Sequence, residues 1–390
     1  MIISAFAALV GGGGAPRASI EMGKMNLNTA EHIWVTAFPA DSDFYNPDSH
    51  PAVWQPYFSS SFGASENTNR IRCKLYEHLR CRHYFRPAYP WHEYVYHHTG
   101  FAKTGMLSVL IGAVMNIVLD PLFIFAFHMG VRGAALATIL SQAVSCIWVL
   151  SFLCGKKTIL HILKKNLILK PEIILPCVAL GLATFIMQAS ESIISVCFNS
   201  SLLKYGGDIA VGAMTILTSV MQFAMLPLQG LGQGAQPVLS YNYGAKNGDR
   251  VKKAFRLLLT ASLCYSTLLW AFIMLFPQVF AEMFTSDSAL LGFTKSALRI
   301  YCACLLLFGI QIACQMAFTS FGKAKASIAV AVTRKFILLL PLIYLLPHIL
   351  TGDKTNAVYM AEPIADFLAV SFTTVLFTFQ FRKVLKELEG

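Results

Sequence analysis

Residues 226–247, LPLQGLGQGAQPVLSYNYGAKN, continue an apolar run that starts near Ile209, although they hold four glycines and two prolines. In water such a composition is typical of a loop. In a bilayer, glycine and proline are tolerated where neighbouring helices satisfy the backbone groups that they free, and small residues let helix backbones approach closely. The stretch therefore predicts a membrane helix that bends, packs tightly and ends at Tyr243-Gly244, before the basic segment 246–256.

The composition of the whole chain agrees with a membrane protein. It is 56% hydrophobic and only 13% charged over 390 residues, with a mean hydropathy of +0.58. A soluble domain carries about 25% charged residues. The ten cysteines show no disulfide or metal framework, and most of them sit in apolar runs, where free cysteine behaves as a small hydrophobe. The apolar N-terminus lacks a basic start and does not predict a cleavable signal peptide.

Nine apolar runs are long enough to cross a bilayer, which takes about 20 residues. Three of them precede the basic linker 155–171, and six follow it. The runs are Ile2–Ile20, Gly105–Phe127, Ala134–Cys154, Ile173–Phe198, Ile209–Tyr241, Leu257–Met283, Ala297–Phe321, Ser327–Leu350 and Ala357–Phe381.

Short matches recur at a nearly constant offset and indicate an internal duplication. The segment 12–26 resembles 234–247 at an offset of about 220, and Pro121-Leu122 matches Pro341-Leu342 at 220. Phe62 to Glu66 matches 284–288, and Gly100 to Lys103 matches 322–325, both at 222. A parallel repeat of membrane helices is a transporter architecture with the substrate path between the halves. We therefore expect two pseudo-symmetric lobes, residues 1–154 and 172–390, joined by a cytoplasmic linker at 155–171.

The net charge of +11 is distributed as membrane topology requires. Basic residues crowd the connectors near 156–170 and 246–256, flank a third connector at Lys323, Lys325, Arg334 and Lys335, and end the chain at 382–386. The alternate connectors 199–208, 284–295 and 351–356 hold one lysine each. This positive-inside pattern predicts a multi-pass plasma (inner) membrane protein with a cytoplasmic C-terminus and excludes nucleic acid as a partner.

Residues 39–99 contain no apolar span, although the repeat requires two there with the length preserved. They hold six of the ten histidines, in spacings that fit no usual zinc pattern. A soluble insertion would have lengthened the offset. A one-nucleotide shift can convert 39–58 and 76–99 into apolar spans, so we interpret 39–61 and 69–99 as translated out of frame.

Short motifs recur through both halves: Gly-Gly-Ala-Pro at 13–16, Phe-Gly-Ala-Ser-Glu-Asn-Thr at 62–68, Gly-Phe-Ala-Lys-Thr at 100–104, and the segments 116–125, 130–138, 234–237 and 241–245. Together they resemble the multidrug and toxic compound extrusion (MATE) family, nearest to its bacterial multidrug-export branch. The resemblance covers about 330 residues. It implies an all-α polytopic membrane protein of twelve helices in two pseudo-symmetric six-helix lobes. The first lobe is expected to lack its first helix.

Ionisable groups within membrane spans are costly and are functional candidates by default. Asp120 lies one turn from Asn116, and Glu191 lies near Gln188. Asp366 lies one turn after Glu362. Each of these acids has an alternative structural role, as an interhelical hydrogen-bond anchor, a packing polar pair or an interfacial charge. The candidate ion-coupling and substrate-binding residues are Asp120, Glu191, Asp366, Asn116, Gln188 and Gln222.

The resemblance implies a monomeric efflux transporter that confers antibiotic resistance, exchanging cationic amphiphilic drugs for Na⁺ or H⁺ without a cofactor. A carboxylate in a low-dielectric cavity attracts either a cationic drug or the coupling ion, and this competition suffices for antiport. The acids, with no basic counterpart expected at mid-span, agree with that function. Two alternatives stay open: a lipid-linked oligosaccharide flippase, which requires a basic cavity, and a fragment that does not transport. The sequence shows no nucleophile–base pair or metal site of the kind that would predict an enzyme.

Overall fold

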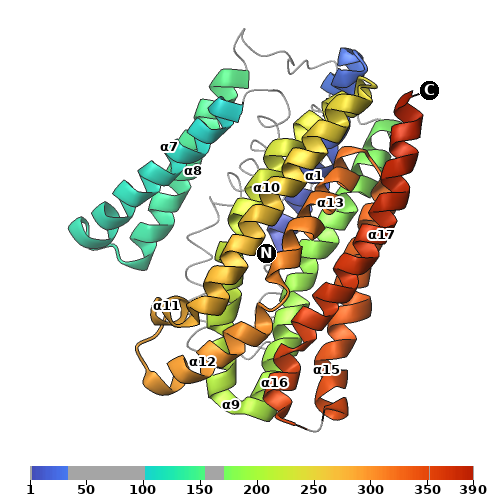
Figure 1. Cartoon of the computed structure of the whole chain (residues 1–390). Helices are drawn as coiled ribbons and strands as arrows, with labels where there is room; N and C mark the ends of the chain where they lie inside the picture. Colours follow the sequence, from blue (N-terminus) through green and yellow to red (C-terminus); the bar gives the residue numbers. More distant parts are fainter. Residues whose placement is uncertain (1, 34–101, 154–170, 351, 390) are drawn as a thin grey trace. The chain divides into compact units, whose positions relative to one another are not determined.

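A computed structural model describes residues 2–33, 102–153, 171–350 and 352–389. These residues form helices and no strand, so the expected all-α architecture is confirmed (Figure 1). The prediction of a shifted reading frame over 39–99 lies outside the described residues. The elements are α1 (Ile2–Gly23), α7 (Ala102–Pro121), η3 (Leu122–Ala126), α8 (Val131–Leu153), α9 (Pro171–Gly244), α10 (Gly248–Leu275), α11 (Pro277–Glu282), α12 (Ser288–Tyr301), η5 (Leu305–Leu307), α13 (Phe308–Ser320), α14 (Ala324–Val332), η6 (Thr333–Leu339), α15 (Leu340–Ile349), α16 (Lys354–Tyr359) and α17 (Ala361–Glu389).

The chain divides into two compact units. The larger unit comprises Met1–Ala5, Ser19–Asn26 and Val178–Gly390, and the smaller one comprises Phe6–Ala18 and Leu27–Cys177. In the smaller unit, α7 packs along α8. The Ser145 hydroxyl of α8 donates a hydrogen bond of 3.1 Å to the carbonyl oxygen of Ser108 in α7.

Five helices in the described ranges are long and apolar enough to cross a membrane, or six if the bent pair α12–α13 counts as one span. One of the five, Glu172–Gly244, has 73 residues, whereas a single crossing needs about 20. It bends at Gly207, whose φ of 66° and ψ of −161° are not helical. Only glycine adopts this backbone region readily. The kink lies between the two predicted runs Ile173–Phe198 and Ile209–Tyr241, so α9 provides two spans.

The predicted run Ala297–Phe321 is not one straight helix. Its axis bends by 44° where α12 gives way to η5 and α13. Such a break frees backbone carbonyls, which must find donors inside a membrane. The neighbouring helix α10 supplies them: the Trp270 indole donates to Ala303 O at 2.9 Å, and the Ser266 hydroxyl donates to Leu306 O at 2.9 Å.

Two apolar clusters fill the interior of the larger unit. One joins both arms of α9 to α12, η5 and α16, with fully buried Phe198, Tyr359 and Leu298 among its members. The other joins α10, α13 and α17 through stacked and edge-on rings. Phe377 lies 4.6 Å from Phe255 and 5.3 Å from Phe318, measured between ring centroids.

The internal repeat is visible in the backbone at the ends of α1 and α9. Both helices end in the same pair of hydrogen bonds: Met25 N–H donates to Met22 O and Asn26 N–H donates to Glu21 O, while Lys246 N–H donates to Tyr243 O and Asn247 N–H donates to Asn242 O. Met25 and Lys246 both have positive φ, 63° and 55°. Every pair of equivalent residues is 221 apart, within the offset expected from the sequence.

The two equivalent helix ends also cross each other at close range. A Cβ placed on Gly23 would lie 2.1 Å from Tyr241 O, and a Cβ placed on Gly244 would lie 2.1 Å from Ile20 O. Gly23 and Gly244 are repeat equivalents, as are Ile20 and Tyr241. Each glycine therefore packs on the backbone of the other repeat, which is the close approach expected of the stretch 226–247.

Candidate functional site

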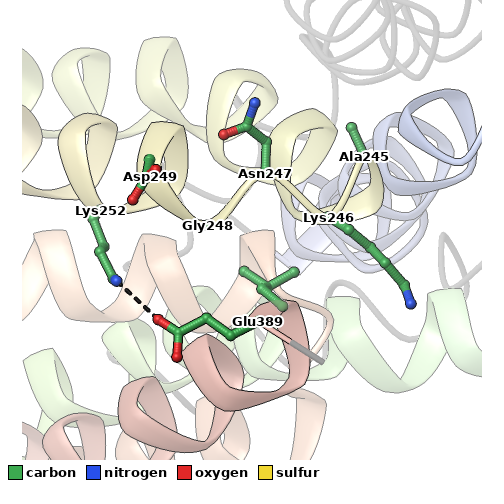
Figure 2. Close-up of a pocket in the computed structure, with 8 residues that line it drawn as sticks. Ala245, Lys246, Asn247, Gly248, Asp249, Lys252 and Glu389 are labelled. Carbon is green, nitrogen blue, oxygen red and sulfur yellow. Dashed lines mark hydrogen bonds and ion pairs between the residues drawn. The ribbon is translucent and has the colours of Figure 1, made fainter.

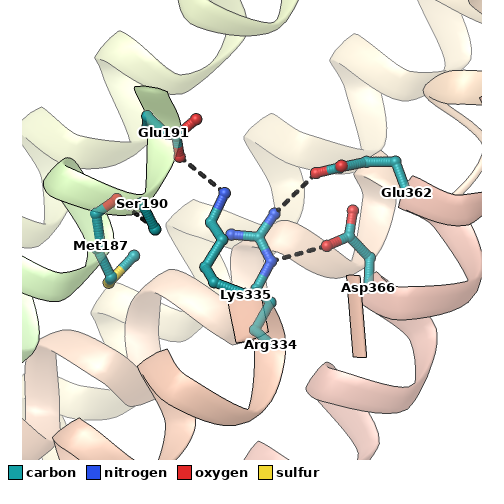
Figure 3. A network of polar contacts seen from close by, with 7 residues as sticks. All are labelled: Met187, Ser190, Glu191, Arg334, Lys335, Glu362 and Asp366. Carbon is teal, nitrogen blue, oxygen red and sulfur yellow. Dashed lines mark hydrogen bonds and ion pairs between the residues drawn. The ribbon is translucent and has the colours of Figure 1, made fainter. Parts of the chain in front are cut away.

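Five charged side chains form a network of two ion-pair groups inside the larger unit, which meet at the adjacent residues Arg334 and Lys335 (Figure 3). Helix α9 supplies Glu191, η6 supplies Arg334 and Lys335, and α17 supplies Glu362 and Asp366. These positions lie within candidate membrane spans. Charges at such depth are expensive unless they are paired, and they mark functional sites.

A π-helical segment presents the two bases. The helix that begins at Ala324 widens to i→i+5 hydrogen bonds over Thr333–Leu339, and Leu340 N–H donates to Lys335 O. Pro341 follows one residue later; its ring cannot donate a hydrogen bond and crowds the preceding turn. Wide turns of this kind occur frequently at functional sites. Here the turn directs consecutive side chains to different partners: Arg334 contacts α17, and Lys335 contacts α9.

Arg334 is the fixed part of the network. Its Nε donates to Asp366 Oδ1 at 2.8 Å and its Nη2 donates to Glu362 Oε1 at 3.4 Å. All three side chains are buried, with 10%, 3% and 7% of their surfaces exposed, respectively. The guanidinium carbon also lies 4.8 Å from the centroid of the Phe308 ring, at cation–π distance. Glu362 and Asp366 are four residues apart on α17, so one face of this helix presents both acids to a single guanidinium.

Lys335 makes the second ion pair. Its Nζ donates to Glu191 Oε1 at 2.7 Å. The pair is asymmetric: the lysine side chain is 5% exposed and the glutamate side chain is 53% exposed. Beside it on α9, the Ser190 hydroxyl donates to Met187 O at 2.9 Å and therefore points back to its own helix rather than to the pair.

The network carries an excess of negative charge. It holds three carboxylates and two bases, so its formal charge with every group ionised is −1. Arg334 faces two of the acids, and Lys335 faces the third. The exposed carboxylate is that of Glu191, and its second oxygen has no hydrogen-bond partner within the described part of the chain. This arrangement is suited to holding one further positive charge.

The expectation that the membrane acids have no basic counterpart at mid-span is wrong. Arg334 and Lys335, which were assigned to the flank of a connector, lie inside a candidate span, Ala324–Ile349, and pair with the acids. At 1.5 Å per residue, Arg334 lies about 15 Å from the start of that span. The sequence already indicated this depth, because the stretch from Ala324 to Arg334 is about half as long as a membrane span, which places the two bases near its middle.

The predicted residues of the larger unit divide into two groups. Glu191 and Asp366 belong to the network, joined through Lys335 and Arg334. Gln188 is half-buried, almost one turn before Glu191 on α9, and Gln222 is exposed on the second arm of α9. No hydrogen bond connects either glutamine to the network within the described residues. Glu362 was noted in the sequence only as a neighbour of Asp366, although the structure makes it a member of the network.

The remaining predicted residues, Asn116 and Asp120, lie on α7 in the smaller unit. Their side chains are half-buried on one face of the helix, one turn apart. Asn116 Nδ2 and Asp120 Oδ1 are buried atoms without a hydrogen-bond partner among the described residues. A buried donor or acceptor without a hydrogen-bond partner destabilises the protein until a partner binds it. The amide donor of Asn116 and the carboxylate acceptor of Asp120 therefore form a second candidate polar site.

Elsewhere in the larger unit, the turn after α9 borders a hollow of about 330 Å³ (Figure 2). Ala245, Lys246, Asn247 and Leu388 line it, together with the Lys252–Glu389 ion pair of 3.1 Å. Both partners of that pair are well exposed, at 43% and 64%. An exposed ion pair of this kind contributes little stability, in contrast to the buried pairs of the network.

The described residues contain no group of three or more histidine, cysteine, aspartate or glutamate side chains arranged to hold a metal ion. Cys177, Cys197, Cys264, Cys302, Cys304 and Cys314 are free thiols. The candidate site is thus built from carboxylates, a guanidinium and an ammonium.

Comparison with known proteins finds relatives for more than half of the chain. Residues 183–345 match the MatE family model. Multidrug export protein MepA of Staphylococcus haemolyticus is 23% identical over 267 residues, which are 68% of this chain and 58% of that protein. The Staphylococcus aureus (strain NCTC 8325) MepA is 23% identical over 247 residues, 63% of this chain and 54% of that protein. The matched part of the chain thus spans somewhat more than half the length of these relatives.

Solved structures share the fold. An outward-facing multidrug resistance MATE family transporter of the MOP superfamily superposes with a TM-score of 0.89 at 23% identity, over 99% of this chain and 86% of that one. A MOP superfamily transporter from Pyrococcus furiosus, described as having a binding pocket of reverse polarity that suggests a different function, gives a TM-score of 0.89 at 23% identity. That match covers 100% of this chain and 86% of the other. The expected polytopic architecture of MATE transporters is confirmed.

Proposed function

We propose that the chain is a MATE multidrug efflux transporter that exports cationic amphiphilic compounds in exchange for Na⁺ or H⁺. The network formed by Glu191, Arg334, Lys335, Glu362 and Asp366 carries this proposal, because its excess negative charge lies within the membrane spans. A drug cation and a coupling cation would compete for that charge, and each would favour a different arrangement of the two lobes.

The polarity of the network distinguishes this proposal from a flippase for an anionic lipid-linked sugar. Such a cargo requires unpaired bases, whereas Arg334 and Lys335 both contact acids. The acids outnumber the bases three to two, so the remaining charge attracts cations. We further propose a monomeric plasma-membrane protein with its C-terminus in the cytoplasm, as the basic connectors indicate.

In the proposed transporter, Glu191 binds the cargo or the coupling ion from its exposed side, and Arg334 holds Glu362 and Asp366 in place. Asp120 and Asn116 offer a second polar position in the other unit, where an acceptor and a donor await partners. Gln188, almost one turn from Glu191, and Gln222 on the second arm of α9 are proposed to contact cargo rather than ions. Neither needs to break a hydrogen bond of the network to do so.

Efflux depends on the reading frame of residues 39–99. As written, this segment holds several arginines, and each would cost roughly 2.5–3.5 kcal/mol at the centre of a membrane helix. We expect cells with the chain as written to accumulate ethidium like efflux-deficient cells without it. A frame-corrected version should export the dye. Equal efflux from both at matched membrane levels would contradict the frameshift interpretation, and no efflux from the corrected version would contradict the proposed function.

In the version that exports ethidium, Glu191→Gln should abolish most of the efflux at an unchanged membrane level. The amide keeps the shape and hydrogen-bonding capacity of the side chain but removes its charge. Asp120→Asn should have a similar effect if that carboxylate is a coupling site. Glu389→Gln is the matched control, because it also removes a carboxylate from a lysine ion pair, but at an exposed position. Wild-type efflux in both Glu191→Gln and Asp120→Asn would limit these acids to structural roles.

A further inference from the structure

The two halves of the charged network differ in how firmly each base is held. Arg334 contacts two carboxylates of α17 and the Phe308 ring of α13, so its side chain is held by two other helices. Lys335 contacts one carboxylate through one of the three donors of its ammonium group. A planar guanidinium with several partners is anchored, whereas an ammonium on a four-carbon stem with one partner moves easily. The Lys335–Glu191 pair is therefore the exchangeable half.

Accessibility of the pair is also one-sided. Glu191 is 53% exposed and Lys335 is 5% exposed, so an incoming cation reaches the carboxylate and not the ammonium. Lys335 is held by the protein on the buried side, at hydrogen-bond distance from Glu191. It occupies the place where a free cation would otherwise neutralise this carboxylate.

We propose that Lys335 is the resting cation of the site: its tethered ammonium occupies Glu191 until a monovalent organic cation takes the carboxylate from it. This inference rests on the proposed function and assigns a specificity-determining role to a residue outside the expected set. A tethered competitor raises the concentration of cargo needed for binding, as any competing ligand at high effective concentration does. Lys335 adjoins Arg334, whose single guanidinium balances the two charges of Glu362 and Asp366, so these acids are the alternative partners proposed for the released ammonium.

The competition also defines the chemical class of the cargo. A neutral compound cannot take the place of the ammonium, because it carries no charge that would neutralise the Glu191 carboxylate. A cation of charge one replaces the ammonium at Glu191 and brings the formal charge of the five-residue network from −1 to 0, once Lys335 joins the other two acids. Large apolar cations are favoured over Na⁺ here, because they carry little hydration to lose when they enter a low-dielectric site.

The test measures binding of tetraphenylphosphonium to the purified full-length chain in detergent micelles. Lys335→Met removes the competitor and should bind the probe about tenfold or more tightly than the wild type, which corresponds to about 1.4 kcal/mol. Glu191→Gln should weaken binding about tenfold, and Lys335→Met should bring no gain in the Glu191→Gln background. Lys335→Arg keeps the charge and adds donors, so it should bind the probe no more tightly than the wild type. Lys252→Met, which breaks the exposed pair, is the matched control and should change nothing.

Each outcome decides between the proposals. If Glu191→Gln weakens binding but Lys335→Met leaves it unchanged or weaker, Lys335 is not a competitor, and the cation site at Glu191 stands. If Glu191→Gln binds as the wild type does, Glu191 is no cation site and the proposed function loses its main support. Lys335→Gln, which keeps polarity and most of the side-chain length, replaces Lys335→Met if the latter does not fold. Ethylammonium adds a direct check, because it should compete with the probe in Lys335→Ala and not in the wild type.

Discussion

Replacing Arg334 by leucine is expected to destabilise the protein by roughly 3–5 kcal/mol, the cost of leaving buried charges without their counter-ion. Glu362 and Asp366 are 7% and 3% exposed, and Arg334 is the base that contacts both. Without it, two carboxylates four residues apart on α17 face each other's charge in a low-dielectric interior. The apparent free energy of unfolding, followed by tryptophan fluorescence as the fraction of denaturing detergent rises in mixed micelles, measures the loss.

The matched controls separate the buried charges from the loss of an arginine as such. Arg382→Leu removes an exposed arginine from the same helix that carries the two acids and should change the unfolding free energy little. The triple variant Arg334→Leu, Glu362→Gln, Asp366→Asn removes the charges together and should recover much of the lost stability. A small effect of Arg334→Leu, comparable to that of Arg382→Leu, would contradict the view that this guanidinium neutralises both acids.

The helical architecture could be predicted from the sequence because apolar length alone identifies a membrane span. The repeat was also detectable, since Gly23 and Gly244 with their flanking residues lie at nearly the expected spacing. The bends could not be placed in advance. Gly207 and the break after Tyr301 fall within or beside apolar runs, and their geometry depends on donors from other helices, such as Trp270 and Ser266. Hydropathy carries no information about those partners.

The candidate site was predicted in part. Glu191 and Asp366 stood out because a carboxylate within an apolar run is unusual. Arg334 and Lys335 were assigned to a connector, since two adjacent bases near Lys323 and Lys325 resemble one more basic flank. What distinguishes them is the π-helical segment, which directs one base to α17 and the other to α9, 144 residues away in the sequence. Neither contact has a periodic signature in the sequence.

Gly244→Ala is expected to be among the most damaging single-methyl additions in this chain. The added Cβ would lie 2.1 Å from Ile20 O and 3.1 Å from Ile20 Cα, which are backbone atoms that cannot rotate away. The ends of α1 and α9 would have to separate. Overpacking of this kind costs about 1–3 kcal/mol and occasionally more. Without such a clash, replacing glycine by alanine within a helix raises the free energy of unfolding by roughly 0.5–1 kcal/mol. A gain in stability would therefore contradict the close contact at Gly244.

Gly234→Ala on the same helix provides the comparison, because a Cβ there meets nothing within 4 Å. It should leave the unfolding free energy unchanged or slightly raised, while Gly244→Ala lowers it. The duplication adds a second test: Gly23→Ala places its Cβ 2.1 Å from Tyr241 O and should cost about as much as Gly244→Ala. The double variant should cost less than the sum of the two, because one separation of the helix ends relieves both clashes. Full additivity would show that the two glycines act at independent contacts, contrary to the crossing of equivalent helix ends.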